Sequence, residues 1–130
     1  TTESIRHIRD GTSNTLMVSE LLPYDSSADA RGGWVLNAMG STNFTARNGP
    51  NSDIDDHVPM CESNIPVNDV RHCTQNRNDG LCWASARSRH PGGVQVALAD
   101  ASVRFVAESI ELSVWRAAST RYNSETVTLP

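Results

Sequence analysis

The stretch that most restricts the fold of this chain runs from Ser88 to Val106, with the sequence SRHPGGVQVALADASVRFV. Pro91 fixes its own φ angle and the two glycines after it tolerate positive φ, so a sharp turn is expected there. Two runs then alternate apolar with polar or small residues, the period of two that is typical of a strand. Asp100 and Ala101 have the place of a two-residue hairpin turn. The segment predicts a β-hairpin whose strands cover residues 94–99 and 103–108.

A short helix is expected at the start of the chain. Ile5 and Ile8 are three residues apart, the spacing of one helical face, and Thr2 or Ser4 can act as N-cap. Gly11 fits the position just after the C-terminus of such a helix. The pattern predicts about two turns.

A second helix is predicted over residues 110–120, with Ser109 as its N-cap. Leu112, Trp115 and Ala118 share one face at three-residue spacing, and Trp115 is expected to anchor the helix in the core. Strands are also predicted at residues 15–22, 34–39 and 125–130. Together these elements predict an α+β fold with a mostly antiparallel sheet and short helices.

The segment 41–87 is the least regular part of the sequence, with isolated apolar residues among Asn, Asp, Ser, Gly and Pro. Cys61, Cys73 and Cys82 lie in it without a CxxC pair, so zinc-ribbon and redox motifs find no support. We expect one disulfide that ties this segment, which would indicate an extracytoplasmic compartment. The sequence does not choose among the three pairings, although loop length favours Cys73–Cys82; three reduced thiols are the alternative.

Length and composition limit the classes of protein. We expect residues 1–130 to form a single globular domain, a fragment of a longer chain whose export or anchoring segment would precede Thr1. Fifteen acidic residues against eleven basic ones give a net charge of −4, which disfavours nucleic-acid binding. No apolar run reaches the roughly 20 residues of a membrane helix, so no membrane contact is expected in this fragment.

His90 and Asp100 suggest a metal or acid–base site, but strand geometry separates them. A strand rises about 3.3 Å per residue, which places the two roughly 20–30 Å apart. We therefore interpret His90 as a residue that fixes the turn before Gly92, and Asp100 as an acceptor of backbone hydrogen bonds in the hairpin.

The aspartates of residues 53–56 and the tryptophans each have a structural and a functional interpretation. Asp53, Asp55 and Asp56 form either a solvated acidic loop or a calcium site completed by carbonyl groups. Trp34 is expected in the core, like the tryptophan of the second helix, whereas Trp83 is the candidate for an exposed sugar-stacking side chain. The histidines lack HExxH spacing, no GxSxG elbow is present, and Gly92-Gly93 is too short for a phosphate-binding loop, which disfavours a hydrolase or a nucleotide enzyme. No cofactor is expected, with calcium as the one alternative.

Three blocks of this chain resemble the planctomycete-type pilin-like family of unknown function. They are RDGTSNTLMVSE at 9–20, the hairpin segment at 88–106, and SIELSVWRAAST at 109–120. The sequence hallmark of that family is a histidine followed, after nine intervening residues, by Asp-Gly. Here His90 and Asp100 have that spacing. Two departures are Ala101 in place of the glycine and SRYNSE in place of a glycine-rich run. The residues that match the family motif, all interpreted as structural, are Gly11, Thr12, Ser13, Asn14, Thr15, Glu20, Ser88, His90, Pro91, Gly92, Gly93, Asp100, Ser102, Val103, Arg104, Phe105 and Trp115.

The resemblance implies a type IV pilin-like or type II secretion pseudopilin-like subunit. Members of that family carry a cleaved prepilin leader and a long apolar helix that anchors the precursor in the inner membrane, followed by a globular head. This chain would be the C-terminal part of the head, periplasmic or on the cell surface, with other pilin-like subunits or surface components as partners.

Three hypotheses about function follow. The first is a non-catalytic head domain that acts in assembly or surface interaction. The second is a glycan- or calcium-binding module that uses Trp83 and the aspartates of residues 53–56. The third is a metal-dependent hydrolase around His57, His72 or His90, which requires those histidines to converge on one ion.

Overall fold

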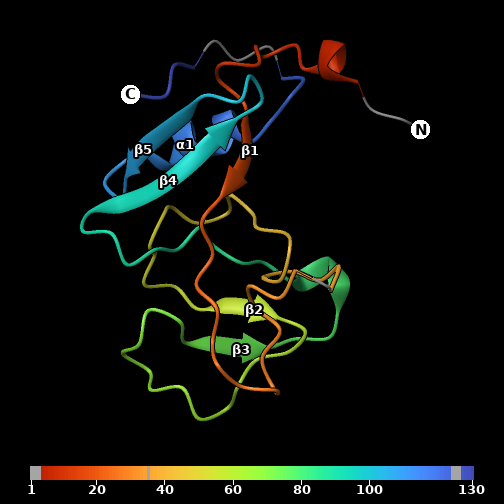
Figure 1. Cartoon of the computed structure of the whole chain (residues 1–130), viewed down its shortest axis with the longest axis vertical. Coiled ribbons are helices and arrows are strands. Elements are labelled where there is room, and N and C mark those ends of the chain that lie inside the picture. Colours follow the sequence, from red (N-terminus) through yellow and green to blue (C-terminus); the bar gives the residue numbers. More distant parts are fainter. Residues whose placement is uncertain (1–3, 35, 124–126) are drawn as a thin grey trace.

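The predicted hairpin forms the centre of the larger sheet (Figure 1). The computed structural model describes residues 4–34, 36–123 and 127–130. In it, β4 (Gly93–Leu98) pairs antiparallel with β5 (Val103–Ala107) on one side and with β1 (Leu16–Ser19) on the other. The strand order is therefore β1-β4-β5. The hairpin is confirmed, and β1 is a shorter version of the strand predicted at residues 15–22.

One face of this sheet is buried under the only α-helix in the described part of the chain. Val94, Val96 and Leu98 alternate along β4 toward that face and are at most 2 % exposed. The helix α1 (Leu112–Ala118) lies behind β4 and β5 in Figure 1 and contributes Trp115, which is fully buried. Burying each such side chain contributes about 1.5–3 kcal/mol, so this cluster is the main core.

A smaller sheet lies below the first, inside the segment predicted to be irregular. Here β2 (Asp56–Val58) and β3 (Cys73–Gln75) pair in parallel, and the one-turn 3₁₀ helix η2 (Asp79–Leu81) follows. Val58 of β2 and Cys73 of β3 form a second, smaller apolar cluster with residues of the surrounding loops, Cys61, Ile65 and Ala84. The fold is thus α+β with a mostly antiparallel sheet, as predicted.

A disulfide between Cys61 and Cys73 crosses this smaller cluster, with 12 residues of sequence separation and Cα atoms 6.0 Å apart. The expected single disulfide is present, but the favoured Cys73–Cys82 pairing is wrong. The side chain of Cys82 instead donates to the carbonyl of Asn76 at 3.1 Å. Loop length was a poor guide, because the fold of the second cluster decides which cysteines meet.

Both predicted helices are shorter than expected. The first is a single 3₁₀ turn, η1 (Ile5–His7), after Ser4 at the N-cap position; Thr2 lies outside the described residues. Ile5 is 67 % exposed, so no packing extends the turn. The second helix, α1, begins at Leu112, so its N-cap residue is Glu111 and not the predicted Ser109.

Two predicted strands are wrong or only partly described. Among residues 34 and 36–39, none belongs to a strand, and Trp34 is 86 % exposed. The cause is a tight loop in which the Ser41 hydroxyl donates to the carbonyls of Ala30 and Gly33. Residues 127–130 are also not a strand, although Leu129 is buried; residues 124–126 lie outside the described part.

The turn between β4 and β5 is not the predicted two-residue type. The N–H of Ala101 donates to the carbonyl of Leu98, and the N–H of Leu98 donates to the carbonyl of Ser102, both at 2.9 Å. Ala101 has a φ of 67°, while Asp100 does not have positive φ. This is a type I turn followed by a bulge residue in the left-handed region.

The bulge shifts the pairing by one residue and so decides which face of β5 is buried. A two-residue turn would place Val103 opposite Leu98, on the core side. In the structure Val103 pairs with Ala97 and Phe105 with Gln95, so both lie on the outer face, and Val106 takes the buried position.

Replacing Ala101 with glycine is expected to stabilise the domain. A left-handed backbone is strained for alanine and natural for glycine, so we expect a gain of about 0.5–1 kcal/mol in the free energy of unfolding. Thermal denaturation should show a rise of about 2–4 °C in Tm. The same substitution at Ala99, which lacks positive φ, should lower Tm. A lower Tm for Ala101→Gly would contradict the turn geometry.

Candidate functional site

The turn before β4 is held by a hydrogen-bond network centred on Ser88. Its hydroxyl donates to the carbonyl of Gly93 at 2.6 Å and accepts the N–H of His90 at 3.0 Å. The side chain of Asn51 accepts the N–H of Ser88 at 2.8 Å and donates to the Gly93 carbonyl at 3.2 Å. A Cβ at Gly93 would lie 2.2 Å from the carbonyl oxygen of Val106, so only glycine fits here.

His90 links this turn to the end of β1 through Glu20. One oxygen of the Glu20 carboxylate lies 3.1 Å from Nε2 of His90, and the other accepts the N–H of Gln95 at 2.7 Å. The His90 side chain is 54 % exposed. This pair therefore joins the turn to β1 and β4 at the surface.

Asp100 lies at the opposite end of β4 from His90. Its carboxylate accepts the hydroxyl of Ser102 at 2.6 Å and the N–H of the same residue at 2.9 Å. These hydrogen bonds, led by the hydroxyl, lower the pKa of Asp100. The backbone N–H of Asp100 donates to the carbonyl of Thr12 at 3.1 Å, and the N–H of Ala99 donates to the carbonyl of Thr15 at 2.9 Å. Asp100 therefore positions the first matched block against the hairpin.

A buried ion network joins β2 to the segment that leads into β4. Both carboxylate oxygens of Asp56 accept hydrogen bonds from the Arg87 guanidinium, at 2.9 and 3.0 Å. One of them also accepts the N–H of Ser85. The second pair is Arg31 with Asp29, joined at 2.7 and 2.9 Å. Nη1 of Arg31 also lies 3.8 Å from Asp56.

All four charged residues of this network are at most 9 % exposed, and their formal charges cancel. Burial by itself would raise the pKa of Asp29, but the hydrogen bonds from the Arg31 side chain and from the N–H of Glu62 outweigh it and lower that pKa. The network is a structural connection and not an accessible site.

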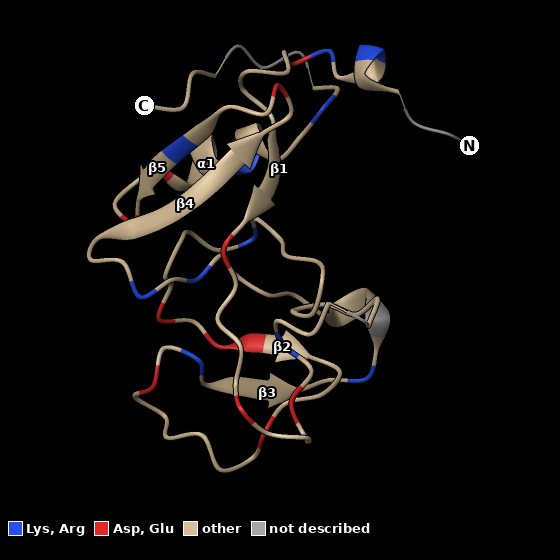
Figure 2. Ribbon diagram, in the orientation of Figure 1, with Lys and Arg blue, Asp and Glu red and all other residues tan. Residues whose placement is uncertain are grey.

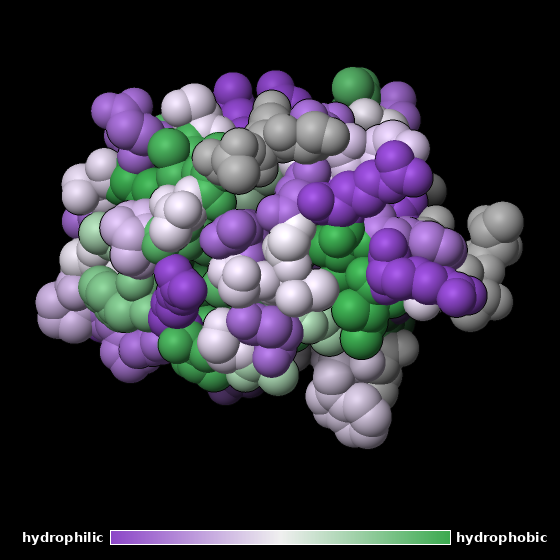
Figure 3. All heavy atoms as spheres, turned by 90° about the horizontal axis from the view of Figure 1, so that it is seen from above, coloured by the Kyte–Doolittle hydropathy of each residue, from purple (hydrophilic) through white to green (hydrophobic). Residues whose placement is uncertain are grey.

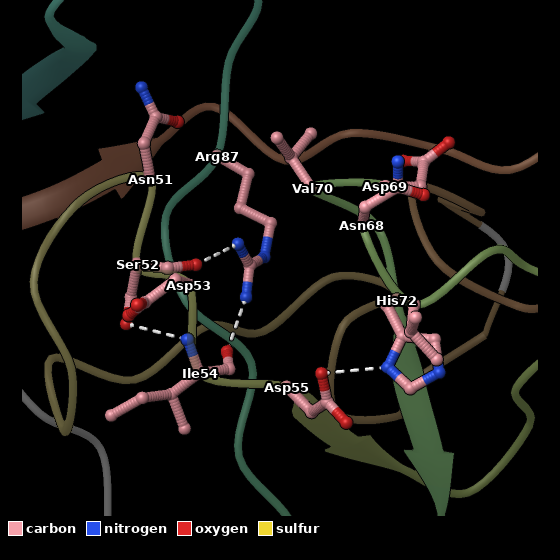
Figure 4. Close-up of a pocket in the computed structure, with 11 residues that line it drawn as sticks. Asn51, Ser52, Asp53, Ile54, Asp55, Asn68, Asp69, Val70, His72 and Arg87 are labelled. Atoms are coloured by element: carbon pink, nitrogen blue, oxygen red, sulfur yellow. Dashed lines mark hydrogen bonds and ion pairs between the residues drawn. The ribbon is translucent and has the colours of Figure 1, made fainter.

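The three aspartates considered as a calcium site do not converge. Asp56 is buried against Arg87, as described above. Asp55 points into a hollow, where one of its oxygens lies 2.7 Å from Nδ1 of His72, and Asp53 is exposed (Figure 4). Calcium needs six or more oxygen ligands around one point, which these side chains do not surround.

The hollow in Figure 4 has a volume of about 190 Å³. Its rim carries the exposed side chains of Ile54, Val67 and Val70. Asp69 lies on the wall of the hollow. Its carboxylate accepts hydrogen bonds from the side chain and the backbone N–H of Arg71, and these hydrogen bonds hold the pKa of Asp69 far below its usual range. The hollow thus contains internally paired charges beside a small apolar rim.

The histidines proposed for a metal-dependent hydrolase occupy different surroundings. His72 pairs with Asp55, His90 pairs with Glu20, and His57 lies in β2. Among the residues that the structure describes, one group could supply three metal ligands, but two of its members form the disulfide. That group is Asp29, Cys61 and Cys73.

The outer face of the larger sheet is apolar and uncovered. Val18, Ala97 and Val103 are direct partners across the three strands, so their side chains form one row, and Phe105 extends it along β5. The exposed fractions are 55 % for Val18, 68 % for Val103 and 45 % for Phe105; Met17, at the bulge in β1, is 66 % exposed. We call these five residues the outer sheet face.

Comparison with family models decides the family. The model described as "Protein of unknown function (DUF1559)", SBP_bac_10, matches residues 3–113. The chain belongs to the DUF1559 family. The comparisons with curated proteins and with solved structures gave no match. The DUF1559 match spans β1 to β5, and its last residues enter α1.

In this DUF1559 chain the three tryptophans have different surroundings. Trp115 is in the core as predicted, whereas the same prediction for Trp34 is wrong. Trp83 is half-buried: His57 stacks on one face with ring centroids 3.8 Å apart, and the Arg47 guanidinium lies 3.9 Å from its centroid. Since Trp83 is covered on both sides, it is not a free platform for a sugar ring.

Proposed function

We propose that this DUF1559 domain is the non-catalytic, extracytoplasmic head of a type IV pilin-like or pseudopilin-like subunit. In this proposal the outer sheet face contacts neighbouring pilin-like subunits or other surface components. The observation that carries it is the exposure of an apolar sheet face on the side opposite α1.

The outer sheet face has two properties of an interaction surface. Contiguous exposed apolar side chains on a soluble domain mark binding surfaces. In addition, β5 is an edge strand, and in the alternation of an antiparallel ladder the N–H and C=O groups of Val103 and Phe105 point away from β4. An edge of this kind can pair with another chain.

Two further observations support the rest of the proposal. The disulfide between Cys61 and Cys73 is the kind of bond that persists in oxidising compartments such as the periplasm and cell surface. The hallmark residues His90 and Asp100 make contacts within the fold at opposite ends of β4. No helix in the described residues is long and apolar enough to cross a membrane.

Replacing Val103 with glutamate tests the role of the outer sheet face. We expect at least a tenfold loss of the protein, expressed from its own gene, from assemblies sheared off the cells, because a charge would be buried at the contact. The Tm of the domain should change by less than about 2 °C, since Val103 is exposed.

The matched control is Val67→Glu, because Val67 is 85 % exposed and lies away from the larger sheet. This control should assemble like the unchanged protein. Normal assembly of Val103→Glu, or an equal loss with Val67→Glu, would contradict the proposal.

A further inference from the structure

Trp34 is the most exposed of the three tryptophans, with 86 % of its surface in solvent. The indole N–H groups of Trp83 and Trp115 donate to the carbonyls of Asp55 and Asn48, each at 3.0 Å. Among the described residues, no group accepts the indole N–H of Trp34. Tryptophan is largely buried in most folded proteins, so an indole in this position is unusual. Both its ring face and its N–H can meet a ligand.

The segment that carries this indole, residues 30–43, has a fixed base, and we call it the tryptophan loop. The N–H of Gly32 donates to the carbonyl of Gly40 at 2.9 Å, and the hydrogen bonds of the Ser41 hydroxyl brace the same segment. A Cβ at Gly40 would lie 2.9 Å from Cγ1 of Val58, so the base packs closely on the second apolar cluster. A loop that is ordered before binding loses less conformational entropy when a ligand binds.

The side chains that follow Trp34 on the loop surface are polar and uncharged. Nδ2 of Asn43 donates to Oδ1 of Asn37 at 3.1 Å, and both residues are exposed. The Thr42 hydroxyl donates to the carbonyl of Leu36 at 3.2 Å, which ties the two arms of the loop together. A carboxamide has two N–H donors and an oxygen acceptor, so the asparagine pair keeps both a donor and an acceptor for a ligand.

The loop carries no charged residue. None occurs between Arg31 and Arg47 in the sequence, and Figure 2 shows no red or blue in this stretch. By contrast, strongly hydrophilic side chains extend over the end of the molecule seen in Figure 3. Phosphate groups and anionic membranes are recognised by arginine and lysine, so the loop favours a neutral ligand.

We propose that the tryptophan loop binds a neutral carbohydrate whose pyranose rings have flat C–H faces. The face of an indole is the negative side of its quadrupole, and it attracts the weakly positive C–H groups of such a ring stacked on Trp34. The amides of Asn37 and Asn43 are then the partners of the sugar hydroxyls, which both donate and accept. The proposal does not rest on the pilin-like function, because the loop is separate from the outer sheet face.

The test is calorimetric titration of the disulfide-bonded protein with cellohexaose and with chitohexaose, two neutral chains with flat ring faces. Saturable binding of either probe is the expected result. We expect Trp34→Ala to weaken that binding about tenfold and Trp34→Phe to weaken it less, since phenylalanine keeps a ring face. Asn37→Ala should weaken it at least twofold through the lost hydrogen bond.

The matched control is Tyr122→Ala, because Tyr122 is also an exposed aromatic residue, at 60 %, but contacts Arg9 instead. It should bind like the unchanged protein; an equal loss would show nonspecific adsorption to aromatic side chains and would overturn the proposal. Failure of both probes to bind, or unchanged binding by Trp34→Ala, would overturn it too. So would binding to phosphatidylcholine vesicles in place of the oligosaccharides, since the loop would then contact lipid. Thermal denaturation of each variant, expected within about 2 °C of the unchanged protein, verifies that the fold is intact.

Discussion

Asp56→Ala is expected to lower the free energy of unfolding by about 3–5 kcal/mol, because it leaves buried arginine charge without its partner. Asp56 is 2 % exposed, as is Arg87, and the two are joined by a two-point contact. The substitution also leaves the N–H of Ser85 without its acceptor. Chemical denaturation at neutral pH measures the effect, with Asp53→Ala as the exposed control, expected within about 0.5 kcal/mol of the unchanged protein.

A double-mutant cycle with Arg87→Met separates the ion pair from general loss of packing. Arg87→Met should also be strongly destabilising, since it leaves the Asp56 carboxylate buried. The double variant Asp56→Ala/Arg87→Met should be less destabilised than the two single effects added together, by at least about 1 kcal/mol, because neither charge is left alone. Additive effects, or a loss below about 1 kcal/mol for Asp56→Ala, would contradict the assigned network.

Cys73→Ser is expected to cost about 3 kcal/mol of unfolding free energy. The disulfide closes a loop of 12 residues of separation, and cross-links of that length restrict the unfolded chain by about this amount. The second apolar cluster has few other members, so it has little with which to compensate. Chemical denaturation of Cys73→Ser, compared with the unchanged protein under a reducing agent, measures the loss.

Cys82→Ser is the control, because serine can keep the hydrogen bond to the Asn76 carbonyl. It should lie within about 0.5 kcal/mol of the unchanged protein and still lose stability on reduction. If Cys82→Ser were as damaging as Cys73→Ser, the pairing would involve Cys82 and the assigned disulfide would be wrong.

The hairpin was predictable because its signals are local. Val94, Val96 and Leu98 alternate along a strand, and proline and glycine punctuate its start, so both the strand and its buried face follow from the sequence. The buried face of β5 did not follow, because it depends on the φ angle of Ala101. A non-glycine residue in the left-handed region adds one residue to the turn and reverses the faces of the strand after it.

The region around β2 and β3 was not predictable for a different reason. A parallel pair of three-residue strands has almost no periodic signal, and its cysteine pairing depends on contacts between distant segments. The role of Arg87 was equally hidden, since nothing near it in sequence marks Asp56 as its partner. The outer sheet face had a signal, the apolar residues Val103 and Phe105, but its exposure required the register.

The most direct test of the central claim is photocrosslinking from the outer sheet face in living cells. A photoreactive phenylalanine analogue placed at position 103, in the protein expressed from its own gene, should crosslink to other pilin-like subunits or surface components. The same analogue at position 77, on the exposed segment after β3, should not. Crosslinks from position 103 above those from position 77 are the predicted result; equal labelling at both positions, or none from position 103, would contradict an assembly role for this face.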